Sequence, residues 1–362
     1  MERKRQQKIL VTGGAGFIGS ALVRMLAATE GVHVANVDAL SYAGDLSSLS
    51  GFSAQGQSKH CFYHLDICDA PALKALFIKE QPDAVMHLAA ETHVDRSIDS
   101  PVQAVQTNVM GALSLLEAAR AYWQGLAGVD RERQKAFRFL HVSTDEVYGD
   151  IALDAQPSVE GDAYAPNSPY SASKAGADHL VRAWHETYGL PVLMTHCCNN
   201  YGMYQHPEKL IPHMILNALA GNPLPIYGDG KQQRQWIFVE DHVRALWQVL
   251  QRGVVGETYH IGAGESISNI DLVRMLCAGL EKQMGGGAYE SLITHVADRP
   301  GHDRRYALAT DKIRALGWLP EVNFEQGLLR TVHWYVKNKL WWQHVIDKGY
   351  ALNRQGQVKG GV

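Results

Sequence analysis

The sequence has few cysteines, and they follow no recognisable pairing pattern. Only five occur in 362 residues, at Cys61, Cys68, Cys197, Cys198 and Cys277. An odd number without a Cys-x-x-Cys spacing argues against a disulfide framework and against a zinc site. We therefore expect inert or buried thiols in a reducing compartment, and no bound metal.

The sequence also lacks a strong excess of charge and any long apolar run. Lysine and arginine number 34 against 37 aspartates and glutamates, so nucleic acid is not an expected partner. No stretch approaches the roughly 18 apolar residues of a membrane span, and no signal-like apolar segment opens the chain. These absences favour a cytoplasmic protein without a membrane partner.

No internal repeat or low-complexity block is present, and short apolar runs alternate instead with segments of helical period. Predicted strands cover residues 8–12, 32–37, 61–65, 84–88, 137–142 and 191–195. Predicted helices cover residues 16–28, 70–79, 102–123 and 171–188. This alternation predicts an α/β fold, a Rossmann-like doubly wound parallel sheet with right-handed crossovers.

The length favours about two domains, and the alternation breaks after about residue 195, where proline and glycine become dense. Helical patterns remain at 241–251 and 269–282, and short strands at 254–261 and 293–296. We expect residues 8–198, joined by part of 233–270, to form the Rossmann domain. Residues 199–232 and 271–345 would form a smaller, discontinuous substrate domain, and residues 346–362 a tail.

A glycine-rich turn follows the first predicted strand. In Gly13-x-x-Gly16-x-x-Gly19 the glycines permit a tight turn, let backbone N–H groups approach a pyrophosphate, and let helix and strand pack closely. Asp38 ends the next strand, where its carboxylate would bind ribose hydroxyls and repel a 2′-phosphate. The turn therefore predicts NAD rather than NADP. Asp66 ends the third strand, where it would lie near the adenine or cap the following helix.

Tyr170 and Lys174 stand one helical turn apart at the start of a predicted helix, behind Pro169. An ammonium and a positive nicotinamide beside the phenol would lower its pKa from about 10 and make it a base. The same spacing recurs from Tyr227 and from Tyr335, where we interpret it as structural.

Two adjacent carboxylates, Asp145 and Glu146, follow the fifth predicted strand after Ser143 and Thr144. A helix cap or a solvated loop would explain them structurally. If both face a cleft instead, repulsion and desolvation raise the pKa of one, which leaves one acid and one base. Beside a nicotinamide that accepts and returns a hydride, such a pair can remove a proton and expel water.

These motifs together resemble a known family. The glycine turn with Tyr170-x-x-x-Lys174 resembles the extended short-chain dehydrogenase/reductases. The run from Ser143 to Gly149 resembles the nucleotide-sugar 4,6-dehydratases among them. The resemblance continues through segments 87–97, 199–202, 207–212, 239–242 and 297–303, and it covers most of residues 8–345.

The resemblance implies an enzyme, a hydro-lyase, and assigns a role to each catalytic residue. Tyr170, with Lys174 beside it, would take the proton from the sugar O4 while C4 gives a hydride to NAD⁺, and Thr144 would align O4. Glu146 would remove the C5 proton and Asp145 would protonate the departing C6 hydroxyl, after which the hydride returns to C6. The expected substrate is dTDP-glucose, with another nucleotide sugar such as UDP-glucose left open.

The resemblance also implies the contacts of both ligands. For NAD these are Gly13, Gly16, Phe17, Ile18, Gly19, Asp38, Ser41, Asp66, Ile67, Leu88, Ala90, Thr107, Tyr170, Lys174 and Asn199. For the nucleotide sugar they are Thr92, Thr144, Asn200, Lys209, Leu210, Pro225, Ile226, Tyr227, Arg234, Asn269, Arg299 and His302. The arginines suit a diphosphate because a guanidinium forks onto pairs of oxygens.

Several positions depart from the family pattern. Thr92 replaces a serine, Gln235 an aspartate, His260 an asparagine, and Met203 and His206 a proline and a phenylalanine. These changes leave the chemistry intact, and the base and sugar specificity stays open. A lone substituted histidine such as His260 is expected to be packed or solvated rather than a ligand.

Two other functions and the oligomeric state stay open. A 4-epimerase would not need the Asp145–Glu146 pair, and a non-catalytic NAD- or nucleotide-sugar-binding regulator would not need Tyr170 and Lys174. The family pairs its helices near 102–123 and 171–188 into a dimer, and both segments here are apolar on more than one side. We expect a homodimer, although burial within one chain would give the same pattern.

Overall fold

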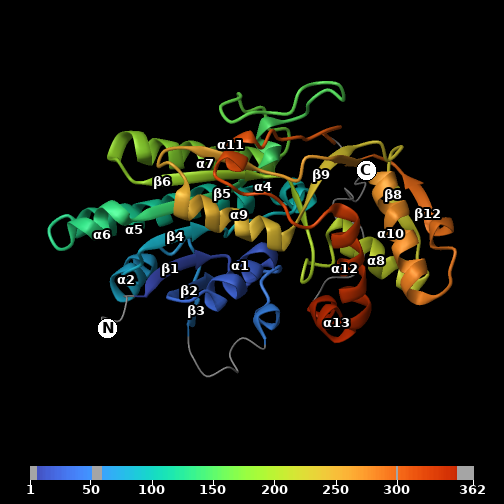
Figure 1. Cartoon of the computed structure of the whole chain (residues 1–362), viewed down its shortest axis with the longest axis horizontal. Coiled ribbons are helices and arrows are strands. Elements are labelled where there is room, and N and C mark those ends of the chain that lie inside the picture. The colour runs from blue at the N-terminus through green and yellow to red at the C-terminus, as the bar shows by residue number, and fades with distance from the viewer. Residues whose placement is uncertain (1–5, 51–58, 299–300, 349–362) are drawn as a thin grey trace, which may run out of the picture.

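The computed structural model describes residues 6–50, 59–298 and 301–348 and centres on a seven-stranded parallel sheet (Figure 1). The strand order is β3-β2-β1-β4-β5-β6-β10. The strands are β1 (Gln7–Thr12), β2 (Val32–Asp38), β3 (His60–His64), β4 (Ala84–His87), β5 (Arg138–Thr144), β6 (Val192–Cys197) and β10 (Thr258–Ile261). The order reverses at β1, as in a doubly wound sheet, which confirms the predicted fold class.

Helices cover both faces of this sheet (Figure 1). On one face lie α1 (Phe17–Ala28) and α9 (Val239–Arg252), and on the other α2 (Ala70–Glu80), α5 (Ala112–Leu126) and α7 (Pro169–Tyr188). The core between the sheet and α1 and α9 is the first core, and the core between the sheet and α2, α5 and α7 is the second. Successive strand residues point to opposite faces, so Val11 belongs to the first core and Leu10 to the second. Burial on both faces explains why these strands are continuous apolar runs in the sequence.

The connection between β4 and β5 is more broken than the single helix predicted for 102–123. It contains α3 (Val94–Asp99), α4 (Pro101–Val105), a π-helical turn (Gln106–Gly111), α5 and α6 (Arg131–Ala136). In the π-turn, the Asn108 amide accepts from the Glu91 N–H at 2.8 Å and donates to Ser173 Oγ at 2.8 Å. The turn therefore fastens this connection to α7, and such turns are frequent at functional sites.

The chain leaves the large sheet between Cys197, the last residue of β6, and Asn199, the first of β7. A small domain follows, with a three-stranded sheet in the order β11-β9-β7 and a two-stranded sheet of β8 and β12. Its elements are β7 (Asn199–Tyr201), α8 (Leu210–Ala220), β8 (Leu224–Tyr227), β9 (Gln233–Phe238), β11 (Ser266–Ser268), α10 (Asn269–Met284), β12 (Ile293–Val296), α12 (Phe324–Lys337) and α13 (Lys339–Asp347). Side chains such as Ile215, Leu276 and Val332 form its core.

Two segments return from the small domain to the large sheet. The first consists of α9 and β10. The strand β10 is shorter than the predicted strand 254–261, because Gly256, with φ +87°, takes part in a turn before it. α11 (Asp311–Ala315) follows β12 and packs near β10, placing Ile313 and Trp318 in the first core. The predicted division had assigned this segment to the second domain. Within the described ranges, none of the helices combines the length and apolar character that crossing a membrane requires.

Candidate active site

The glycine-rich turn joins β1 to α1 through unusually close backbone packing. Gly13 has φ +75°, and a Cβ there would lie 2.7 Å from Ala89 N, while a Cβ on Gly19 would lie 1.9 Å from the Gly13 carbonyl oxygen. The Asp38 carboxylate accepts from Ala15 N at 2.9 Å and from Leu40 N at 2.8 Å, and burial raises its pKa. The α1 N-terminus and an acid at the end of β2 therefore stand together, as a dinucleotide requires.

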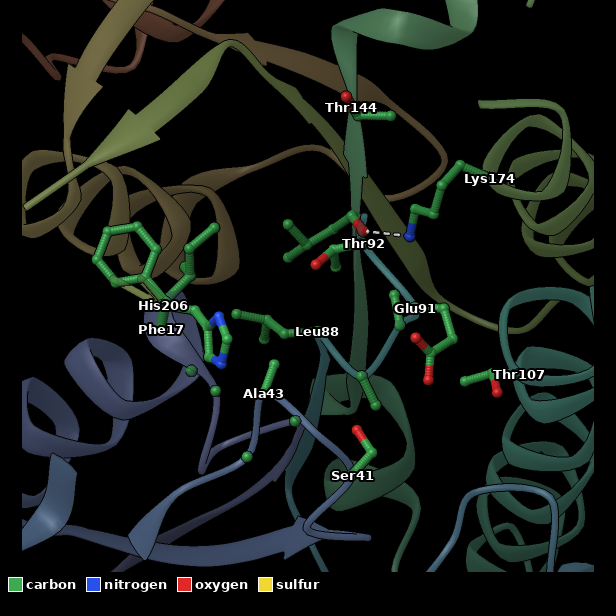
Figure 2. Close-up of a pocket in the computed structure, with 18 of the residues that line it drawn as sticks. Phe17, Ser41, Ala43, Leu88, Glu91, Thr92, Thr107, Thr144, Lys174 and His206 are labelled. Atoms are coloured by element: carbon green, nitrogen blue, oxygen red, sulfur yellow. Dashed lines mark hydrogen bonds between the residues drawn. The ribbon is translucent and has the colours of Figure 1, made fainter. Parts of the chain in front are cut away.

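A cavity of about 360 Å³ opens at the carboxyl ends of the strands, over this turn (Figure 2). Every residue that the resemblance assigns to NAD lines it. Figure 2 shows Phe17 and Leu88 on one side of this cavity and Ser41 and Thr107 on another. Asp66 also lines it, and the helix cap of α2 is Asp69 instead, so the capping alternative for Asp66 is wrong.

The two adjacent carboxylates lie on a short 3₁₀ turn, Asp145–Tyr148, that directly follows β5. Thr144 caps the turn by accepting from Glu146 N at 3.3 Å, and its hydroxyl donates to Asp145 Oδ1 at 3.3 Å. Asp145 is 3% exposed. Burial, reinforced by the Glu146 charge and opposed by Arg234, raises the Asp145 pKa to about 8. Burial therefore favours the protonated form of Asp145 near neutral pH, which is the condition that a division into one acid and one base requires.

Tyr170 and Lys174 lie in the first turns of α7, which begins at Pro169 behind a capping box formed by Ser168 and Ser171. Lys174 Nζ donates to the Val142 carbonyl oxygen at 2.8 Å (Figure 2). Burial and the Glu146 charge raise the Tyr170 pKa, against a hydrogen bond with Thr144 that lowers it. The sequence predicted that Lys174 lowers the Tyr170 pKa. Under the influence of the protein's own groups the Tyr170 pKa is raised instead, because the Lys174 ammonium is directed at β5 and desolvation of the phenolate dominates.

A second cavity, of about 250 Å³, adjoins the first. Five residues line both cavities: Thr92, Glu146, Asn199, Glu208 and Lys209. The predicted sugar-nucleotide residues that line the second cavity are Thr92, Lys209, Leu210, Pro225, Ile226, Tyr227, Arg234, Asn269 and His302, whereas Thr144 and Asn200 line the first. Arg299 lies outside the described residues. Glu146 therefore stands where the two cavities meet.

Comparison with known proteins agrees with this geometry. Residues 10–331 match the family model described as GDP-mannose 4,6 dehydratase. The dTDP-glucose 4,6-dehydratase of Neisseria meningitidis serogroup B is 56% identical over 98% of this chain and 100% of its own. That of Escherichia coli is 52% identical over 97% and 100%. The chain belongs to the nucleotide-sugar 4,6-dehydratase family.

Solved structures with the same fold include both dehydratases and epimerases. The dTDP-glucose 4,6-dehydratase of Streptomyces venezuelae, solved with NAD and TYD bound, matches with TM-score 0.83 and 45% identity over 94% of this chain and 100% of that one. The UDP-glucose 4-epimerase of Thermotoga maritima, solved with UDP-glucose, matches with TM-score 0.79 and 30% identity over 92% and 100%. The fold is therefore shared by both reactions, and the side chains must distinguish them.

Within this dehydratase, the Arg234 guanidinium is less available for contact with a diphosphate than its sequence context suggests. It is 6% exposed, and it donates to the carbonyl oxygens of Gln233 at 2.8 Å, Asp303 at 2.8 Å and Arg304 at 3.3 Å. Its guanidinium also lies 4.2 Å from the Tyr306 ring centroid. Arg234 thus supports the wall of the second cavity, and a fork-like contact with a diphosphate stays a prediction.

Of the departures from the dehydratase pattern, two lie away from both cavities. Gln235 is buried and donates to the Gly264 carbonyl oxygen at 3.0 Å, and His260 is buried on β10 with Nε2 2.8 Å from the Tyr148 hydroxyl. Both side chains are therefore bonded within the protein, and the expectation that His260 is packed rather than a ligand is confirmed. Met203 packs against the small-domain core, whereas His206 lines the first cavity.

Sequence reasoning missed several lining residues of this dehydratase. Glu208 is the clearest, with a side chain 1% exposed that accepts from Arg96 Nε at 3.2 Å. It lies inside segment 207–212, which carried the resemblance, so a signal was present. Tyr306 and Trp236 line the second cavity from positions without a recognised motif.

Proposed function

We propose that the protein is an NAD-dependent hydro-lyase that converts dTDP-glucose to dTDP-4-keto-6-deoxyglucose and water. The observation that carries this proposal is Glu146, which lines both cavities next to the buried Asp145, whose pKa burial raises to about 8. A 4-epimerase removes and returns the C4 hydride and the O4 proton but expels no water, so it needs no such pair. Relatives named for this reaction, at 52% and 56% identity over nearly their whole length, support the proposal.

The residues around the first cavity fit NAD. The α1 N-terminus faces it through a turn in which Gly13 and Gly19 leave no room for a Cβ, which suits a pyrophosphate. Asp38 would accept hydrogen bonds from ribose hydroxyls. When bound, NAD⁺ supplies an acceptor for the C4 hydride, a cationic ring that favours the Tyr170 phenolate, and the same hydride for return to C6.

In the first half of the reaction, we assign the base to Tyr170. Its phenolate would take the proton from O4, and Thr144, a neighbour that lowers the pKa of the phenol, would orient O4 toward it. Lys174 is buried in the same wall and would hold positive charge beside the phenol. Burial of the whole group excludes water from the alkoxide that forms.

In the second half, the 4-ketone acidifies C5 and the two carboxylates act. Glu146 would take the C5 proton, and Asp145, neutral at pH 7, would give its proton to the C6 hydroxyl, which leaves as water. Glu146 would return its proton to C5 once C6 is reduced. The proton balance closes when the proton taken from O4 replaces the one that Asp145 gave to water.

The deciding experiment is incubation of the purified protein with dTDP-glucose, UDP-glucose and their N-acetyl relatives in D₂O. We expect a 4-keto chromophore and deuterium at C5 with dTDP-glucose. Faster conversion of UDP-glucose would move the proposal to that substrate. Absence of turnover with every sugar, in protein that carries NAD, would refute the enzymatic function.

We also propose a cytoplasmic homodimer. The segment formed by α4 and the π-turn exposes Val102, Val105 and Met110 by 80%, 46% and 44%. This apolar face, beside α5 and α7, would be covered by the same face of a second copy. The five free thiols agree with a reducing compartment.

A further inference from the structure

A row of buried polar side chains crosses the middle of the large sheet, on the face that α7 covers. His87 on β4 pairs in register with His141 on β5. Two residues further along β5, Ser143 pairs with His196 on β6, which pairs with His260 on β10. Each is at most 3% exposed, in a layer that is ordinarily apolar in a parallel sheet.

Asp178 on α7 inserts into this row and collects its hydrogen bonds. One carboxylate oxygen lies 3.0 Å from His141 Nε2. The other accepts from Ser143 Oγ at 2.8 Å and lies 3.2 Å from His196 Nε2. The Asp178 side chain is 1% exposed, and these partners hold its pKa well below its usual range in spite of burial. Ser143 donates to this carboxylate and both imidazoles can donate to it, and such partners favour the ionised form of a buried acid.

Lys174 stands one helical turn before Asp178 on the same helix. Its side chain is buried and its ammonium donates to the Val142 carbonyl on β5. Burial lowers the Lys174 pKa, and the Asp178 charge is the largest influence that opposes this. The helix therefore carries one buried positive and one buried negative charge in consecutive turns.

Most other titratable groups facing this pair are neutral at pH 7. From β4 and β5, burial lowers the pKa of His87, and that of His141 to about 4. From β6 and α7, burial raises the pKa of Cys197 to about 12 and that of Tyr170 well above its usual range.

The segment after β5 contributes the remaining groups. Burial raises the pKa of Tyr148 and Tyr164, which keeps both phenols neutral, and that of Asp145 to about 8. Glu146 acts on Tyr170 from the cavity side. His196 also faces Asp178, with its Nε2 at 3.2 Å from the carboxylate.

We propose that Asp178 is a positioning residue of the reaction: its buried carboxylate is the counter-charge of the Lys174 ammonium, and its bond to Ser143 fixes the strand end that carries Thr144, Asp145 and Glu146. It lines neither of the two cavities. The inference rests on the proposed function, because Lys174 matters only if Tyr170 removes a proton.

The test uses Asp178→Asn and a substrate on which only the first half of the reaction can occur. dTDP-6-deoxyglucose has no C6 hydroxyl to lose, so oxidation at C4 ends with NADH, and its absorbance reports the Tyr170–Lys174 step alone. Removal of the negative charge lowers the Lys174 pKa. We therefore expect the alkaline fall in NADH formation to begin about one pH unit lower in Asp178→Asn, the lower end of the effect of a nearby opposite charge. The KM for the sugar nucleotide should be unchanged.

Two further variants separate charge from structure. Asp178→Glu keeps the charge and should restore the wild-type profile. His141→Gln disturbs the same hydrogen bonds but leaves the carboxylate, and should not move the alkaline limb. If Asp178→Asn does not fold, Asp178→Ser takes its place. Loss of fold by both, with His141→Gln folded, would mean a purely structural role and overturn the inference.

The remaining outcomes are also decisive. If wild-type protein forms NADH and the profile of Asp178→Asn is the same, Asp178 is no counter-charge, and the proposed function stands. If wild-type protein forms NADH neither from this substrate nor transiently from dTDP-glucose, the proposed function fails and the inference fails with it.

Discussion

Asp145 and Glu146 are neighbours in the chain, yet their surroundings differ. Asp145 is buried against Thr144, whereas Glu146 is partly exposed to both cavities. Desolvation acts strongly on the first, and the second keeps access to a substrate. A division of roles between an acid and a base follows from where the 3₁₀ turn directs two consecutive side chains.

Replacing Glu146 with glutamine should separate the two halves of the reaction. The amide cannot accept the C5 proton, so we expect dehydration to fall by about 100-fold or more, a typical value for loss of a positioned base. Hydride transfer should persist, so NADH absorbance should appear on mixing with dTDP-glucose. Glu132→Gln, at an α6 side chain that is 83% exposed, is the matched control and should behave as wild type. Normal water loss by Glu146→Gln would assign the base elsewhere.

The pH dependence should report Asp145. Because its pKa is raised to about 8, the acid form is present at neutral pH and is lost above that value. Dehydration should fall about tenfold per pH unit above roughly pH 8. The same raised pKa favours the folded state at low pH, and this stabilisation is lost as pH rises from the unfolded value of roughly 3.9 through about 8.

Asp145→Asn should remove the Asp145 contribution to the pH dependence of dehydration and to the pH dependence of stability. Its unfolding free energy, measured by denaturant titration across this pH range, should fall less with rising pH than that of wild type. A wild-type rate that stays level to pH 10 would contradict the assignment.

At the scale of single residues, short motifs were enough to name residues that the structure places around the two cavities. Lys174 illustrates the limit. Its spacing from Tyr170 was readable, but the Val142 carbonyl that receives its hydrogen bond belongs to another element. Gln235 and His260 show the same limit, since their burial depends on partners such as Leu308 and Tyr148 that are distant in sequence.

Among the elements, the turn between β1 and α1 has the least tolerance for added volume. Gly19→Ala places a methyl group 1.9 Å from the Gly13 carbonyl oxygen, so helix and strand must separate. We expect destabilisation of about 1–3 kcal/mol, as for overpacking, and loss of bound NAD from the purified protein, measured by absorbance after release. Gly125→Ala is the matched control, because nothing lies within 4 Å of its Cβ in α5. It should stabilise the protein by about 0.5–1 kcal/mol. Full NAD content in Gly19→Ala would contradict this account.

Element prediction succeeded where burial and period are local. The strands β1 to β6 are short apolar runs, so their positions were readable. The π-turn at Gln106–Gly111 was not, because the pattern of 102–123 is apolar on more than one side and does not mark where the helical hydrogen bonding changes. In the small domain, β7 and β11 span only Asn199–Tyr201 and Ser266–Ser268, too short to show a period, and β9 supplies the pairing that makes them strands.

At the scale of the whole molecule, the exposed apolar face of α4 and the π-turn should control assembly. Val105→Glu adds a charge that a covered interface cannot hydrate, so we expect a shift from dimer to monomer in sedimentation experiments. Ile78→Glu, at a residue 73% exposed on α2, is the control and should leave the dimer intact. A wild-type monomer would refute the proposed homodimer.

The passage of the chain from β6 to β7 also has an evolutionary consequence. One cavity is built mainly from residues before this passage and the other mainly from residues after it, so most lining residues on either side of it belong to one cavity alone. Mutations after Asn199 can alter which sugar nucleotide is accepted while the proton-transferring residues are transmitted unchanged. A lineage can thereby explore new substrates without passing through an inactive ancestor.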